Sequence, residues 1–364
     1  MKTMIRIGAV AAASALALAA CASAPEDEPT EETTTGAETS ETAAPAEDVD
    51  FMACMVSDAG GFDDKSFNQS AYEGLERAVA ELGITKAEAE STSDSDYGPN
   101  LEAQVAAGCD LIITVGFLLS QATVDSALAN PDVSYAIIDD LADNDFDGTT
   151  DAPNIKPITF ETDEAAFLAG YAAASASTTG TVGTFGGIEI PSVTIFMTGY
   201  QAGVEYYNEQ NDADVQVLGM DSFSGDFDDQ SQGTNITNGF LDQGADIVMP
   251  VAGPVGLGAA SAIQSAGDAW LIGVDSDWTQ TAPEYADIVF TSVLKNIGNS
   301  VFDTIESTVN DGFVADPYVG TLENEGVGVA DFAEGTVSDD VIAALDEISA
   351  GIIAGDIEAS GAAE

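Results

Sequence analysis

Short apolar runs alternate with helical segments along most of this chain, and this alternation restricts the possible folds most strongly. The runs are continuous, as in Leu111–Val115 and Tyr135–Ile138, with few polar residues between the apolar ones. Such strands are buried on both faces, as in a parallel sheet covered by helices. The pattern therefore predicts an α/β fold. Strands are expected at 51–57, 110–116, 133–139, 180–186, 214–220, 245–251, 269–274 and 287–294. Helices are expected at 66–82, 98–108, 118–129, 163–177, 192–209, 228–243, 256–267, 295–310 and 338–353.

The expected folded part runs from about Val49 to about Ile357, which is longer than a single hydrophobic core usually allows. A series of strand–helix units of this length favours two doubly wound lobes. On the number of units alone, an eightfold α/β barrel is the alternative.

The first 20 residues have the features of a secretion signal. Lys2 and Arg6 precede an Ala/Leu-rich stretch that ends in Leu18-Ala-Ala-Cys21. This ending resembles the bacterial lipobox, in which the cysteine is lipidated and becomes the mature N-terminus; a secreted soluble protein is the alternative. The apolar stretch is shorter than the about 20 residues of a membrane span. Residues 21–48 hold the lipidated Cys21 and an acidic Thr/Glu/Ala/Pro segment that is expected to be disordered.

The formal net charge of −57 is extreme, and the chain has no histidine. So acidic a chain is not expected to bind nucleic acid, and its field disfavours a strongly anionic ligand. The lack of histidine excludes His-dependent catalytic triads and the usual His-containing zinc sites. After the signal, the only basic residues are Lys65, Arg77, Lys86, Lys156 and Lys295.

Two cysteines fall in or beside expected strands. Cys54 lies in the first strand, and Cys109 directly precedes the strand at 110–116. In a doubly wound sheet of order 2-1-3 these strands are neighbours. An extracytoplasmic location permits a disulfide, but the sequence leaves a disulfide and two free buried thiols equally open.

Several expected strands end in residues suited to ligand binding. The first strand leads into Asp58, a Gly-Gly turn, Lys65, Phe67 and Asn68. Later strands end in Asp139-Asp140, Gly186-Gly187, Ala252-Gly253, Asp275 and Lys295-Asn296. Because parallel strands place their carboxyl ends at one edge of the sheet, we expect these residues to converge on a cleft.

The residues of this cleft, in their order, resemble the basic membrane protein family of bacterial substrate-binding lipoproteins, whose best-understood members bind purine nucleosides for an ABC importer. The resemblance is carried by Gly60–Gln69, by Gly186-Gly187 with Ile190–Val193 and Phe196, by Val251–Gly253 with Gly256–Gly258, by Gly273–Asp277, and by Ser292–Lys295. It implies a type I periplasmic-binding-protein fold: two Rossmann-like lobes joined by three crossovers. The N-terminal lobe would comprise 49–160 plus about 290–315, and the C-terminal lobe 161–289 plus about 316–357. It also implies a monomer held by a lipid at Cys21 on the outer face of the cell membrane, with an ABC permease as partner.

The resemblance also implies roles for individual residues. Phe67 and Phe196 would sandwich the nucleobase, and stacking of this kind adds about 1 kcal/mol beyond simple burial. Asn68 and Asp139 would meet the base edge, although the doubled Asp139-Asp140 leaves that register open. Asp275, Gly253 and Lys295 would bind the ribose hydroxyls. Asp58 corresponds to a further cleft aspartate.

Other functions are compatible with parts of the sequence. A sugar-binding protein of the same fold would use the same aromatic and carboxylate groups, and a surface sensor or adhesin would use the lobes without transport. An enzyme is disfavoured because the chain has neither a Walker A lysine nor a strand–GxGxxG–helix motif. No cofactor is expected.

An Asp-x-Asp-x-Asp-Gly run at 143–148 matches the first half of a calcium loop. Its twelfth position is Asn154 instead of the bidentate glutamate. Runs of this kind arise by chance in so acidic a chain, so we expect no metal site.

Overall fold

The structure is a computed structural model that describes residues 49–360. The predicted signal peptide at 1–20, the predicted lipidation site Cys21 and the rest of the acidic segment at 21–48 therefore lie outside the described residues. Within the described part, no helix is both long enough and apolar enough to cross a membrane.

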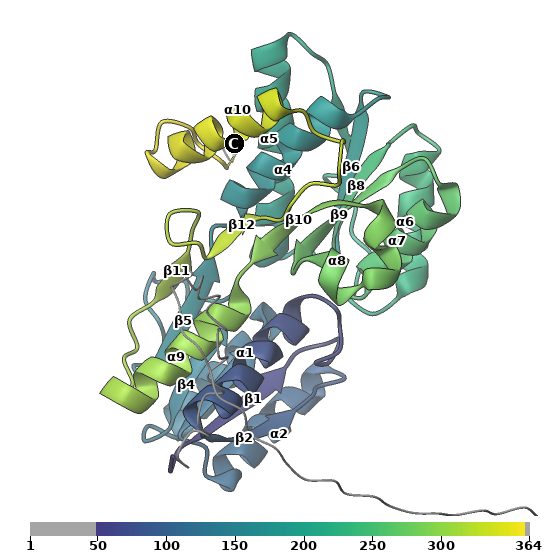
Figure 1. The fold of residues 1–364 in the computed structure, drawn as a ribbon. Helices are drawn as coiled ribbons and strands as arrows, with labels where there is room; N and C mark the ends of the chain where they lie inside the picture. Colours follow the sequence, from purple (N-terminus) through teal and green to yellow (C-terminus); the bar gives the residue numbers. More distant parts are fainter. Residues whose placement is uncertain (1–48, 361–364) are drawn as a thin grey trace, which may run out of the picture. The chain divides into compact units, whose positions relative to one another are not determined.

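Two separate six-stranded sheets form the two lobes, which confirms the predicted α/β fold and excludes a closed barrel (Figure 1). The first sheet has the order β11-β5-β4-β3-β1-β2 and is parallel throughout. Its strands are β1 (Met52–Ser57), β2 (Thr85–Ala89), β3 (Leu111–Val115), β4 (Ser134–Ile138), β5 (Ile155–Phe160) and β11 (Tyr318–Gly320). Its helices are α1 (Phe67–Leu82), α2 (Asp94–Ala107), η1 (Phe117–Leu119), α3 (Ser120–Ala129) and α9 (Ile297–Asp311).

The second sheet has the order β12-β10-β9-β8-β6-β7, in which only β12 runs antiparallel to its neighbour. Its strands are β6 (Thr181–Gly186), β7 (Gln216–Leu218), β8 (Ile247–Val251), β9 (Trp270–Asp275), β10 (Val289–Lys295) and β12 (Val327–Val329). Its helices are α4 (Thr162–Ala176), α5 (Pro191–Asn211), α6 (Gln230–Leu241), α7 (Val255–Ala266), α8 (Trp278–Thr281), η2 (Pro283–Ile288) and α10 (Asp339–Ile353).

The chain passes between the sheets three times: from β5 to α4, from β10 to α9, and from β11 to β12. The later passages differ by a few residues from those expected at about 290 and about 316. β10 belongs entirely to the second sheet, because its buried apolar run pairs with β9. β11 at Tyr318–Gly320 still belongs to the first sheet, where it pairs with β5.

Glycines bring α9, which follows β10, against α1 of the first lobe. A Cβ atom on Gly74 would lie 2.3 Å from the carbonyl oxygen of Gly298, so a side chain at this position would force the helices apart. Arg77 extends the same contact, since its guanidinium lies 3.7 Å from the centroid of the Phe302 ring. This packing fixes the helix that follows the second passage between the lobes.

Cys54 and Cys109 form a disulfide, with their Cα atoms 5.9 Å apart. β1 lies between β2 and β3 in the first sheet, and Cys54 is paired with Ile112 of β3. Cys109 lies just before β3, so the disulfide joins β1 to the segment that leads into the neighbouring strand β3. The sequence had left bonded and free thiols equally open.

We predict that this disulfide stabilises the protein. It closes a loop with a sequence separation of 55 residues, and the loss of such a cross-link typically costs about 2–4 kcal/mol of the free energy of unfolding. A Cys54→Ser/Cys109→Ser variant should therefore unfold at lower guanidinium concentration than the wild type. A reducing agent should shift the wild-type transition in the same direction and leave the variant unchanged; identical wild-type transitions with and without reductant would contradict the prediction.

Candidate functional site

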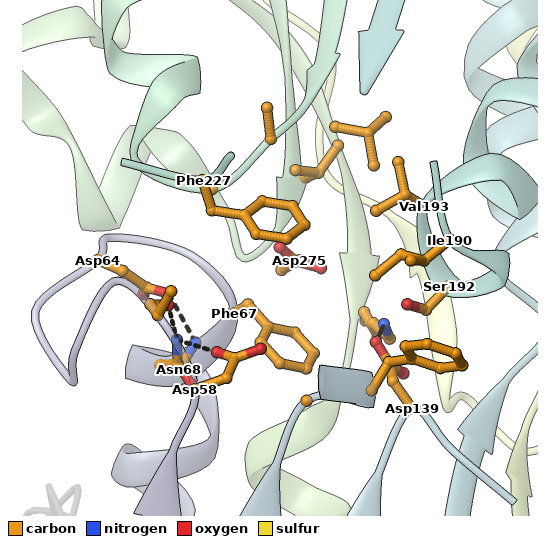
Figure 2. Close-up of a pocket in the computed structure, with 18 of the residues that line it drawn as sticks. Asp58, Asp64, Phe67, Asn68, Asp139, Ile190, Ser192, Val193, Phe227 and Asp275 are labelled. Carbon is orange, nitrogen blue, oxygen red and sulfur yellow. Dashed lines mark hydrogen bonds and ion pairs between the residues drawn. The ribbon is translucent and has the colours of Figure 1, made fainter. Parts of the chain in front are cut away.

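One pocket brings together all eight residues for which the sequence predicted ligand contacts (Figure 2). The first lobe contributes four of them: Asp58 after β1, Phe67 and Asn68 at the start of α1, and Asp139 after β4. The second lobe contributes the other four: Phe196 on α5, Gly253 after β8, Asp275 at the end of β9 and Lys295 at the end of β10. The ends of β1, β4, β8, β9 and β10 thus converge as predicted, whereas Lys65 and the Gly186-Gly187 pair at the end of β6 do not line the pocket.

The start of α1 is held by the carboxylate of Asp64. Its Oδ1 accepts hydrogen bonds from the backbone N–H groups of Ser66 and Gln69 at 2.9 and 3.0 Å, and its Oδ2 accepts one from that of Asn68 at 2.8 Å. A carboxylate at a helix N-terminus satisfies N–H groups that have no partner inside the helix. Asp64 therefore fixes the turn that carries Phe67 and Asn68 into the pocket.

In the side-chain amide of Asn68, the nitrogen is hydrogen-bonded within the protein and the oxygen is not. Its Nδ2 donates to Asp58 Oδ1 and to the carbonyl oxygen of Ala59, both at 3.1 Å. Its Oδ1 is buried and accepts no hydrogen bond from the described residues. Buried amide oxygens are rarely left unpaired, so this atom offers an acceptor to whatever occupies the pocket.

Asp58 lies against a position that only glycine can fill. A Cβ atom on Gly116 would lie 2.0 Å from Asp58 Oδ2, and Gly116 has a φ of +116°, which side chains rarely adopt. Burial raises the pKa of Asp58 well above its ordinary value, and the hydrogen bond from Asn68 opposes that rise. Gly116 thus leaves room for a carboxyl group that burial pushes toward its neutral form.

Lys295 and Asp139 form a buried ion pair across the two lobes. Their side chains are only 2% and 7% exposed. Lys295 Nζ also lies 5.0, 5.3 and 5.5 Å from the ring centroids of Phe67, Phe160 and Phe196. Burial raises the pKa of the Asp139 carboxyl, and the Lys295 ammonium opposes that rise. Asp139, directly after β4, also has a φ of +67°, a backbone conformation that is uncommon for residues other than glycine.

Among residues 49–360, Lys295 is the only cation that lines this pocket. The other basic residues of the described part have partners elsewhere. Lys65 pairs with Asp63, Arg77 with Glu81, and Lys86 with Glu76 and Glu88, while Lys156 Nζ donates to the carbonyl oxygen of Asp316 at 2.6 Å. The pocket therefore sets one ammonium group against four carboxyl groups: Asp58, Asp64, Asp139 and Asp275.

Asp275 is the second pocket aspartate with left-handed backbone, at a φ of +68°. Burial raises the pKa of its carboxyl to about 6, and both Lys295 and a hydrogen bond from Ser66 oppose that rise. Asp275 and Asp139 thus both have left-handed backbone at the carboxyl end of a strand, one in each lobe.

The sequence did not single out every residue of the pocket. Phe117 and Phe227 also line it, as do Ile190, Ser192 and Val193, which the family resemblance included without a role. Phe227 comes from an acidic loop that has no apolar pattern of its own. The residue that makes room for Phe227 is Gly187, where a Cβ atom would lie 2.3 Å from the Phe227 ring. Gly187 is therefore the only sequence feature noted above that relates to the position of Phe227.

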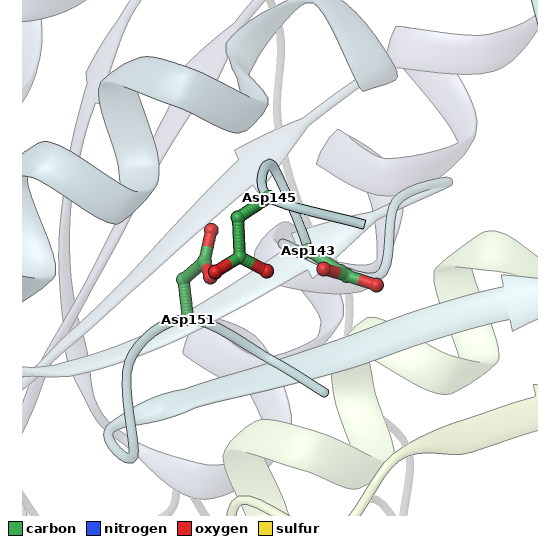
Figure 3. A group of neighbouring side chains, drawn as sticks. All are labelled: Asp143, Asp145 and Asp151. Atoms are coloured by element: carbon green, nitrogen blue, oxygen red, sulfur yellow. The ribbon is translucent and has the colours of Figure 1, made fainter. Parts of the chain in front are cut away.

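A second group of carboxylates lies in the loop between β4 and β5 (Figure 3). Oxygens of Asp143, Asp145 and Asp151 lie within 4.8 Å of one another. Backbone N–H groups of the loop itself satisfy some of them, as in the 2.9 Å bond from Gly148 to Asp143. Asn154, the residue in the twelfth position, turns away and donates to the carbonyl oxygen of Val133 at 2.8 Å. The absence of a metal site here stays a prediction.

Comparison with known proteins identifies the family to which this chain belongs. Residues 51–359 match the sequence model of the family described as "ABC transporter substrate-binding protein PnrA-like". Basic membrane protein A of Borreliella burgdorferi is 38% identical over 243 residues, which cover 66% of this chain and 68% of that protein. The ABC transporter nucleoside-binding protein BmpA of Lactococcus lactis is 33% identical over 296 residues, covering 76% of this chain and 81% of that protein.

A solved structure supports the same assignment. The crystal structure of an ABC transporter solute-binding protein from Aeropyrum pernix matches with a TM-score of 0.76 and 27% identity, covering 85% of this chain and 92% of that one. Proteins of this kind are solute-binding proteins and not enzymes. They bind a small molecule on the extracytoplasmic side and deliver it to a membrane permease. The chain belongs to the basic membrane protein (Bmp) family of PnrA-like ABC transporter substrate-binding proteins.

Proposed function

We propose that this protein binds a nucleoside, purine nucleosides above all, in the pocket between its lobes and presents it to an ABC importer. The observation that carries this proposal is the pair of aromatic rings contributed by different lobes. Phe67 and Phe196 both lie within 5.5 Å of Lys295 Nζ, measured to the ring centroids. Two rings that approach one pocket from opposite lobes suit a flat heterocycle, which stacks on both.

The polar groups around the rings suit the rest of a nucleoside. The unpaired Asn68 Oδ1 and the Asp139 carboxylate are acceptors for N–H groups on the edge of a base. Asp275, Lys295 and the backbone of Gly253 are acceptors and donors for the hydroxyl groups of a ribose. Asp58, whose pKa burial raises, adds a carboxyl group that donates when protonated.

The charge of the pocket favours a neutral ligand. Four carboxyl groups face one ammonium group, and the whole chain carries a formal net charge of −57. A phosphorylated nucleoside would meet repulsion from nearly every charged group in the pocket. The L. lactis relative is named as a nucleoside-binding protein, which supports the same ligand class. We expect the protein to act as a monomer, without a cofactor.

Thermal unfolding against a panel of ligands tests this function. Adenosine, guanosine, inosine, cytidine and uridine would be compared with adenine, AMP, D-ribose and D-glucose. A ligand at about 100 times its Kd adds about 2.7 kcal/mol to the free energy of unfolding, so a nucleoside that binds should raise Tm clearly. Purine nucleosides should give the largest shifts, and AMP should give none.

A Phe67→Leu variant tests the role of stacking, because leucine keeps apolar volume at this position but removes the aromatic ring. It should unfold like the wild type without ligand and lose most of the nucleoside-induced shift. A rise of Tm with sugars and none with any nucleoside would contradict the proposal and favour a sugar-binding protein of this fold.

The buried ion pair allows the roles of its residues in folding and in binding to be separated. Asp139→Asn or Lys295→Met alone leaves one buried charge unpaired, and each should lower the free energy of unfolding by about 3–5 kcal/mol. Asparagine is chosen because it tolerates the left-handed backbone at position 139. The Asp139→Asn/Lys295→Met double variant should regain most of this stability, since neither charge remains alone.

The double variant should nevertheless fail to bind adenosine or guanosine in calorimetric titrations, because both polar contacts are altered. Urea unfolding gives the stability comparison on the same samples. If the double variant bound as tightly as the wild type, neither Lys295 nor Asp139 would be a ligand contact.

We also propose that the protein is anchored to the cell membrane by a lipid on Cys21, on the strength of the Leu18–Cys21 sequence. Expressed in a bacterial host, the wild type should partition into the detergent phase on Triton X-114 separation. Cys21→Ser should move it to the aqueous phase, while the Cys54→Ser/Cys109→Ser variant should remain with the detergent. Wild-type protein in the aqueous phase would favour a secreted soluble form.

A further inference from the structure

Ser66 occupies the position at which a serine normally caps its own helix, yet it does not do so. It immediately precedes α1, and its side chain makes no hydrogen bond to the N–H groups of the first turn. Serine is among the residues most favoured at this position because its hydroxyl satisfies one of these groups. Here Asp64, two residues earlier, satisfies two of them, those of Asn68 and Gln69, and also accepts from the N–H of Ser66 itself. The hydroxyl of Ser66 is therefore free for another contact.

That contact crosses between the lobes. Ser66 Oγ lies 2.6 Å from Asp275 Oδ2 and 3.2 Å from the carbonyl oxygen of Val274, at the end of β9 in the second sheet. Ser66 is fully buried, and Asp275 is 8% exposed. A short O–H···O bond to a carboxylate in a buried setting is among the stronger hydrogen bonds that proteins make.

Asp275 faces the pocket beside Phe67 and Phe227 (Figure 2). Its Oδ2 is bonded to Ser66, while its Oδ1 accepts no hydrogen bond from the residues that the structure describes. The bond from Ser66 therefore fixes one oxygen of the carboxylate and leaves the other for the pocket. The backbone of Asp275, at a φ of +68°, supports the same orientation from within the strand end.

We propose that Ser66 is a positioning residue that couples contact between the lobes to the orientation of Asp275, and that it thereby slows release of the ligand. This inference rests on the proposed nucleoside function of the same pocket. The bond forms only when the start of α1 meets the end of β9, so a ligand that leaves by separation of the lobes must break it. Association requires no broken bond, so the effect of Ser66 falls on dissociation.

The first test is the dissociation rate of adenosine and of guanosine from wild type and Ser66→Ala, measured by stopped-flow fluorescence. Loss of one hydrogen bond to a charged group should raise the dissociation rate about 10-fold, with the association rate within about 2-fold of wild type. Ser70→Ala is the matched control. Ser70 lies one turn further along α1, outside the pocket, and makes no side-chain hydrogen bond within the described part of the chain.

A second pair of variants separates the hydroxyl from the shape of the side chain. Ser66→Thr and Ser66→Val have the same shape, and only the first keeps the hydroxyl. The valine variant should release adenosine about 10 times faster than the threonine variant. Equal rates for this pair, equal rates for wild type and Ser66→Ala, or an equal loss in Ser70→Ala would each overturn the inference.

The pH dependence of affinity gives a readout that a merely structural role would not move. Lys295 at the end of β10, Asp139 after β4 and Asp64 before α1 are the charged groups that act on the Asp275 carboxyl. The pKa of Asp275 is about 6, so its carboxylate, which accepts from the ligand, is present above that pH and is lost as the pH falls through it. The Ser66 bond favours the ionised form, so Ser66→Ala should move the fall in affinity to higher pH, by about one pH unit. An unchanged midpoint would overturn the inference.

The failure of the proposed function gives a different result. Wild-type protein that binds no nucleoside contradicts that function but not the role of Ser66. The same comparison would then be made with whichever sugar stabilises the wild type in the thermal panel.

Discussion

The buried pair of Lys295 and Asp139 is the interaction on which the arrangement of this protein depends. Each charge is almost fully removed from water, and neither is tolerable there without the other. Because Asp139 directly follows β4 of the first sheet and Lys295 ends β10 of the second, their pairing requires the two sheets to present their carboxyl ends to the same pocket. The three aromatic rings around Lys295 Nζ exclude water from the pair and strengthen its attraction. The pocket is thus built around one desolvated ammonium group.

The passages of the chain between the lobes place this pair. Lys295 is the last residue of β10, and Asn296 directly after it begins the second passage. The backbone N–H of Asn296 donates to the carbonyl oxygen of Gly326 in the third passage, at 2.9 Å. Glu164, in the first turn of α4 after the first passage, accepts from the N–H of Leu322 at 2.7 Å. Hydrogen bonds therefore join the third passage to each of the other two, and the residue that carries the central charge lies at their edge.

The sequence predicts best the strands that are continuous apolar runs, and it misses strands whose apolar pattern is short or interrupted. Central strands such as β3 are continuous apolar runs and were found where expected. β2 was missed because it is an edge strand of alternating polar residues, Thr85–Ala89, and β5 because Lys156 and Pro157 interrupt it. The three-residue edge strands β11 and β12 are too short to leave a pattern, which explains why the lobe boundary expected at about 316 falls before β11.

The site divides along similar lines. Strand ends are fixed by the strands themselves, so Asp139, Asp275 and Lys295 could be placed from the sequence, and the family resemblance supplied Phe67 and Phe196. The role of Ser66 could not be predicted, because the local rule assigns its hydroxyl to its own helix. Only the structure shows that Asp64 caps the start of α1 in place of Ser66. The choice between a disulfide and free thiols likewise depended on a Cα separation that no sequence pattern contains.

The count of acidic residues overstates the negative charge of the pocket. Burial raises the pKa of Asp58, Asp64, Asp139 and Asp275, so desolvation moves all four toward the neutral form. A carboxyl group donates a hydrogen bond when it is protonated and only accepts when it is ionised, whereas a lysine or an asparagine oxygen has a single role. A pocket with one cation and four carboxyl groups of raised pKa can therefore donate or accept hydrogen bonds at several positions, and it still disfavours anions. In a chain with a formal net charge of −57, burial is what gives this pocket an electrostatic character distinct from that of the surface.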